Sequence, residues 1–163
     1  MKKKTPNPAN EWIKQIKDRR QAAEQRARED AEFETKARQF YEANVEGFWG
    51  DICKKLTAAV ESYNLDLEPK QKVRANVEPG GNKAFTALKN YYPAGHLVCA
   101  LDAHVWMIEV GYTFRANGDR PPEEYIRQYA IASNGKALTL RHGENVVVVD
   151  ITQQLLAPYF ERI

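Results

Sequence analysis

Long apolar runs are missing from this 163-residue chain, and no stretch approaches the roughly 18 apolar residues of a membrane helix. The basic start, Met1 to Pro6, is not followed by the apolar core of a signal peptide. We therefore expect a cytoplasmic protein with no membrane partner. Cysteine is equally scarce, and Cys53 and Cys99 stand alone in apolar segments. This setting predicts two reduced core residues and argues against a disulfide framework or a catalytic thiol.

Motifs of catalysis and nucleotide binding are also missing. The sequence has neither a glycine-rich phosphate loop nor the nucleophile elbow of a hydrolase. Four potential metal ligands lie close together in the sequence: His96, Cys99, Asp102 and His104. An extended strand would point His96 and Cys99 to opposite faces and would separate His96 from His104 by about 26 Å. We therefore predict no metal, no cofactor and no catalytic residues.

Charge of one sign is in small excess. The formal net charge is +2, and residues 1–38 alone carry +4, from 11 basic and 7 acidic side chains. The basic excess therefore lies in the N-terminal segment. An excess of this size does not by itself indicate a nucleic-acid partner.

The sequence does contain a change of hydrophobic period near residue 66. Apolar residues recur every three or four positions before it, most densely over 33–63, and alternate every two positions after it. These are the periods of helix and strand. The pattern predicts an α+β protein with a long N-terminal helix, a mostly antiparallel meander of five to seven strands, and a short C-terminal helix. Asp150 would cap that last helix, and Pro158 is expected to disrupt it or end it early.

The N-terminal helix divides into two parts by composition. We expect residues 1–7 to form a disordered basic tail, residues 8–32 a charged helical arm, and residues 33–163 a single α+β domain. The arm is rich in strong helix formers, whereas aromatic residues beginning with Phe33 mark the part expected to be buried. Gly47 and Gly50 interrupt that second part, so they predict a kink or the close approach of another backbone.

Turn signals separate the expected strands. Pro79–Asn82 reads as a hairpin loop, Asn117–Pro122 as a longer loop, and Asn134–Gly135 as a tight hairpin in which both positions tolerate positive φ. The strands themselves are expected at 73–77, 84–91, 96–101, 105–115, 124–132, 137–142 and 145–149.

The leading functional hypothesis is an interaction or regulatory protein without catalytic activity. Trp12, Ile13 and Ile16 form a small apolar group on the arm, with Phe33 further along. Exposed aromatic and aliphatic groups of this kind mark interfaces, so the arm is expected to bind a second copy of the chain or another protein.

One alternative is a pocket between sheet and helix that holds a small hydrophobic ligand or a substrate. The residues that would line it are Trp106, Tyr112, Tyr125 and Tyr129. Glu109, the one carboxylate in an apolar strand, would act as an acid or base if shielded from solvent. If it faces solvent, we expect it to pair with a lysine or arginine on a neighbouring strand.

A second alternative is binding of RNA or another single-stranded nucleic acid on the wetter face of the sheet. Basic side chains alternating with aromatic ones form such platforms. The basic candidates are Lys72, Arg74, Arg115 and Arg141, with tyrosines from 91–92 and 125–129 between them.

Overall fold

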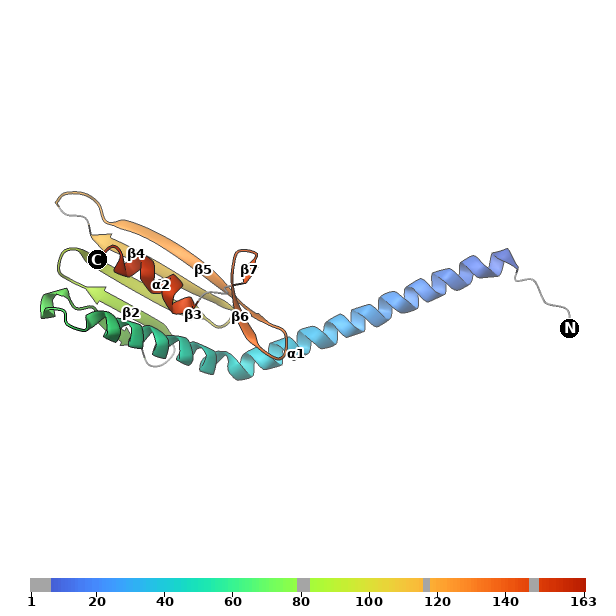
Figure 1. The fold of residues 1–163 in the computed structure, drawn as a ribbon. Helices are drawn as coiled ribbons and strands as arrows, with labels where there is room; N and C mark the ends of the chain where they lie inside the picture. The colour runs from blue at the N-terminus through green and yellow to red at the C-terminus, as the bar shows by residue number, and fades with distance from the viewer. Residues whose placement is uncertain (1–6, 79–82, 116–117, 147–149) are drawn as a thin grey trace.

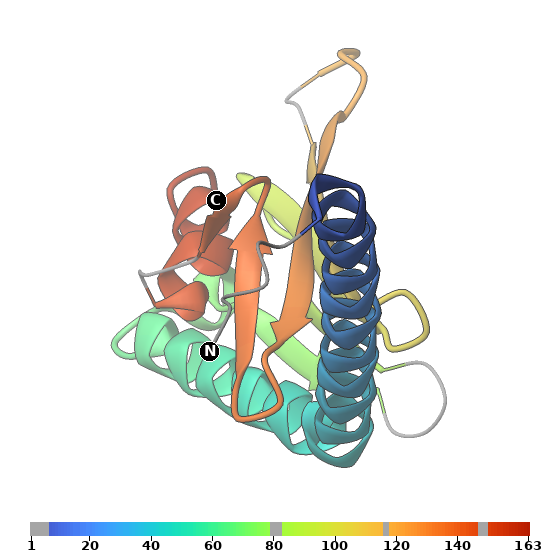
Figure 2. The same cartoon turned by 90° about the vertical axis from the view of Figure 1, so that its right-hand side faces the viewer.

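A single helix, α1 (Pro8–Asn64), forms the whole N-terminal part of the fold. The computed structural model describes residues 7–78, 83–115, 118–146 and 150–163. The helix begins at Pro8, the first residue of the expected arm, and ends at Asn64, directly after the apolar pattern of 33–63. Its first half projects away from the rest of the chain, and it changes direction where it meets the sheet (Figures 1 and 2). The basic tail at 1–6 lies outside the described residues.

Seven strands follow and form one antiparallel sheet, in which each strand pairs with the next along the chain. This meander confirms the predicted fold class. The hairpin loop expected at 79–82 and the end of the last expected strand, at 147–149, lie outside the described residues, as do residues 116–117. The strands are β1 (Arg74–Val77), β2 (Ala84–Lys89), β3 (Ala94–Asp102), β4 (Met107–Arg115), β5 (Glu123–Ser133), β6 (Leu138–His142) and β7 (Asn145–Val146).

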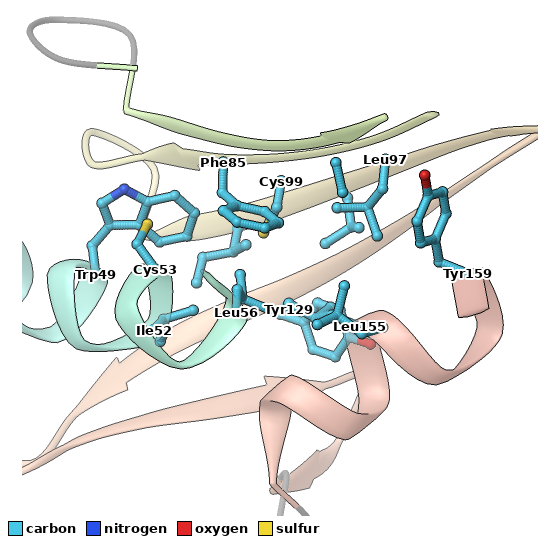
Figure 3. Packing of buried hydrophobic residues seen from close by; sticks show 14 of the residues in the cluster. Trp49, Ile52, Cys53, Leu56, Phe85, Leu97, Cys99, Tyr129, Leu155 and Tyr159 are labelled. Atoms are coloured by element: carbon cyan, nitrogen blue, oxygen red, sulfur yellow. The ribbon is translucent and has the colours of Figure 1, made fainter. Parts of the chain in front are cut away.

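The core lies between one face of the sheet and two helices, the second half of α1 and the C-terminal α2 (Ile151–Phe160). Figure 3 shows side chains from both layers meeting, with Leu56 on α1 and Leu155 on α2 facing strand residues such as Phe85. Complete burial of an aliphatic or aromatic side chain of this size contributes about 1.5–3 kcal/mol. Both cysteines are free and buried here, as predicted.

The hairpin between β5 and β6 forms where Asn134–Gly135 predicts it. Only Gly135 adopts a positive φ, +81°. The Asn134 side chain instead accepts hydrogen bonds from the backbone N–H groups of Lys136 and Ala137, at 2.9 and 2.8 Å. The turn is therefore a longer loop stabilised by an asparagine side chain.

Helix α2 begins as predicted, since the Asp150 carboxylate accepts a hydrogen bond from the Thr152 N–H at 3.0 Å. The expectation that Pro158 would disrupt the helix or end it early is wrong, because the helix continues to Phe160. A proline costs a helix the hydrogen bond of its missing N–H. Here that single loss falls in the last turn, and burial of Tyr159 holds the turn against the sheet.

Candidate functional site

The first half of α1 touches almost nothing else in the described part of the chain. Every described side chain from Asn7 to Lys36 is exposed. Three of them are large and apolar, with exposed fractions of 56% for Trp12, 39% for Ile13 and 41% for Ile16. Residues three and four apart share one side of a helix, so the three form one surface, called here the arm patch.

Burial on α1 begins at Ala37, where the β5–β6 hairpin meets the helix. A Cβ atom on Gly135 would lie 3.6 Å from Lys36 Cβ, so the loop rests directly on α1. Phe33 comes one turn earlier and is 55% exposed. Its expected place in the buried stripe is therefore wrong, because no other element of the described structure lies opposite that turn.

A groove of about 590 Å³ runs along the second half of α1 beside the edge strand β1. Trp49, Cys53 and Val77 contribute apolar walls. At the rim, the Lys83 ammonium donates a hydrogen bond to the Glu46 carboxylate at 2.6 Å, which lowers the pKa of Glu46. The lining residues of this α1–β1 groove are Glu46, Trp49, Gly50, Cys53, Lys54, Thr57, Ala58, Glu61, Val77, Glu78 and Lys83.

The two helical glycines border open space. A Cβ atom added to Gly47 or to Gly50 would meet no atom within 4 Å. Helix α1 continues through both positions, and Gly50 lines the groove while Gly47 does not. The sequence predicts a kink or the close approach of another backbone at these glycines, and no described part of this chain makes that close approach.

Glu109 and the four aromatic residues of the pocket hypothesis lie on opposite faces of the sheet. Tyr112 and Tyr129 are packed in the core, and Trp106 stacks on Tyr41 with ring centroids 3.8 Å apart. Glu109 is exposed and accepts a hydrogen bond from the Gln128 amide at 2.9 Å. Its partner is thus an amide and not the expected lysine or arginine. The fourth aromatic, Tyr125, stacks on Tyr112 at 4.6 Å.

Two of the basic residues of the nucleic-acid hypothesis and two of its tyrosines are separated in the same way. The strand register places Arg74 and Arg141 on the open face of the sheet. Tyr125 and Tyr129 stand opposite Tyr112 and Ile108 and so share the face that the helices cover. Their expected place on the wetter face is wrong, because alternation along β5 turns them inward.

No metal site is found in the part of the chain that the structure describes. His96 and Cys99 lie on opposite faces of β3, and no three potential metal ligands among the described residues come together. None of the described helices is long and apolar enough to cross a membrane. Comparisons with protein families, curated proteins and solved structures find no match. Function is therefore inferred from the geometry of this chain.

Cys53 provides a chemical probe of the groove that it lines. Burial raises its pKa to about 11, so the reactive thiolate is rare at neutral pH. We expect alkylation of the folded protein by iodoacetamide to accelerate about tenfold per pH unit from pH 8 to pH 10, because the thiolate fraction rises in that proportion below the pKa. Mass spectrometry of the modified peptides measures the rate, and buried Cys99 serves as the unreactive control. A rate that levels off near pH 9 would contradict the raised pKa.

Proposed function

We propose that this protein is a non-enzymatic interaction protein that associates with further copies of itself through its N-terminal arm. The observation that carries the proposal is the arm patch, in which Trp12, Ile13 and Ile16 are exposed together on a helix that projects from the domain. Large apolar side chains grouped on a surface mark interfaces, and tryptophan is prominent among the residues that dominate binding energy.

The energetics of the arm support the same proposal. A helix gains most of its stability in proteins from packing an apolar face, and exposed helices are marginal without it. Within the arm, the Gln25 amide donates a side-chain hydrogen bond to the Glu29 carboxylate at 2.9 Å, which supports the helix. Such a contact contributes only about 0.2–0.5 kcal/mol. Burial of the arm patch by a second chain would add a larger contribution.

Removal of residues 1–30 should leave the domain folded and abolish association. No described side chain in that segment is buried, so the core from Ala37 onward keeps its contacts. The full-length double variant W12A/I16A should lose association as well. Light scattering gives the solution mass, and circular dichroism checks the fold.

Tyr91→Ala is the matched control, since Tyr91 is an aromatic side chain of similar exposure, 53%, outside the arm. It should associate like the unmodified chain. A full-length protein that is monomeric, or a truncated protein that keeps its oligomeric mass, would overturn the proposed function.

A further inference from the structure

The arm patch and the α1–β1 groove are two apolar surfaces of one chain, and neither is covered by a described residue. We propose that the arm patch of one copy docks in the α1–β1 groove of a second copy. This inference rests on the proposed self-association and names the surface that receives the arm. It makes the contact heterologous, joining two different surfaces, so that two chains can exchange arms or several can form a larger assembly.

The geometry of α1 requires the contact to join two molecules. Helix α1 is continuous from Pro8 to Asn64. At 1.5 Å per residue, Trp12 lies about 38 Å along the axis from Ala37, where the helix meets its own domain. The groove starts further on, at Glu46. A rigid helix cannot fold back on itself, so the arm patch can reach a groove only in another copy.

The dimensions of the groove suit a helix with a few large apolar side chains. Its α1 wall extends from Glu46 to Glu61, which corresponds to about 22 Å of helix. The arm patch occupies little more than one turn, between Trp12 and Ile16. The groove therefore has room for these side chains and for the backbone that carries them. Val77 on the edge strand is 44% exposed and would become covered by the docked arm.

Gly50 gives the most specific support for docking of a second helix in the groove. Glycine is the least favourable helix residue after proline, yet this one lies in mid-helix beside open space. A residue without a side chain allows a second backbone to come close. Thr57 and Ala58, further along the same wall of the groove, are also small. A docked helix in a second copy accounts for a glycine that no contact among the described residues explains.

Charge is complementary between the two surfaces. Residues 8–20, which contain the arm patch, have four basic and two acidic side chains, a formal charge of +2. The groove has three acidic and two basic lining residues, a formal charge of −1, and one of its pairs, Glu46 with Lys83, is internally neutralised. Opposite charges around an apolar contact favour encounter and correct register, so association should weaken as salt rises.

Leucine substitution at each of the two glycines distinguishes docking in the groove from contacts elsewhere on α1. Gly50→Leu fills the groove, whereas Gly47→Leu adds the same side chain to an exposed position outside it. Both variants should fold, because leucine favours helix and its Cβ atom has no neighbour within 4 Å at either position. Sedimentation equilibrium should show association weakened at least about tenfold by Gly50→Leu and by no more than about twofold by Gly47→Leu.

Cys53 supplies a second measurement that needs no change in the groove. Alkylation of Cys53 by iodoacetamide should be slower in the associated protein than in the W12A/I16A variant at equal concentration, because the docked arm covers that wall. Equal rates would overturn the inference. So would unchanged association in Gly50→Leu. If W12A/I16A still abolishes association in that case, the arms bind elsewhere, for example to each other, and the proposed function stands. A chain that never associates removes both proposals.

Discussion

Leu56→Ala should lower the free energy of unfolding by about 2–5 kcal/mol. Leu56 has no exposed surface and lies on α1 where the helix meets the sheet and α2 (Figure 3). Truncation there removes apolar burial and leaves a cavity that close-packed neighbours fill only in part. Urea denaturation followed by circular dichroism measures the change. The loss should appear as a lower transition midpoint with an unchanged slope.

Leu65→Ala is the matched control for this substitution. Leu65 is the same residue type, just beyond the end of α1, but it is 70% exposed. Its truncation should change the free energy of unfolding by no more than about 0.5 kcal/mol. Similar losses from both variants would mean that the second half of α1 does not pack on the sheet as described.

Gly95→Ala should cost about 1–3 kcal/mol, because it overpacks the contact between α2 and the sheet. An added Cβ atom would lie 2.7 Å from Ile163 Cγ2, 3.0 Å from Tyr159 Cε2 and 3.1 Å from Phe114 Cδ1. Tyr159 cannot easily move away, since its buried hydroxyl donates a hydrogen bond to the Gly95 carbonyl at 2.8 Å. Thermal and urea denaturation report the loss of stability.

Gly111→Ala tests the same change without the crowding. Gly111 lies in the neighbouring strand β4, and an added Cβ atom there would meet nothing within 4 Å. Alanine should leave stability unchanged or raise it by up to about 1 kcal/mol, since glycine loses more conformational freedom on folding. A neutral Gly95→Ala, or equal effects at the two positions, would contradict the close packing of α2 on β3.

The starts of α1 and α2 and the order of the strands follow from local signals. Proline at the first helical position, as at Pro8, and a capping carboxylate, as at Asp150, act through neighbouring backbone groups. The meander follows from short connections between segments with alternating polarity. These features depend on residues close in sequence, and the structure agrees with them.

The predictions from sequence are wrong where the environment of a residue depends on distant parts of the chain. The aromatic pattern places Phe33 in the core, but the β5–β6 hairpin reaches α1 only at Ala37. The sequence offers two places for Tyr125 and Tyr129, a pocket under the helices or the open face, because alternation alone does not say which face the helices cover. Pro158 was expected to break α2, but tertiary packing of the last turn outweighs its local cost.

By itself, the sequence determined the fold class, the long helix with its charged first part, and the three apolar residues of the arm patch. Hydrophobic period and capping are local properties, so one chain segment at a time is enough to recognise them. Only the tertiary structure decided that the arm patch is left exposed and that a groove lies beside Gly50. The groove exists because Trp49 on α1 and Val77 on β1, which are far apart in the sequence, line the same hollow. The hydrophobicity of a residue does not depend on whether another residue covers it. The folded topology decides which residue, if any, lies against it.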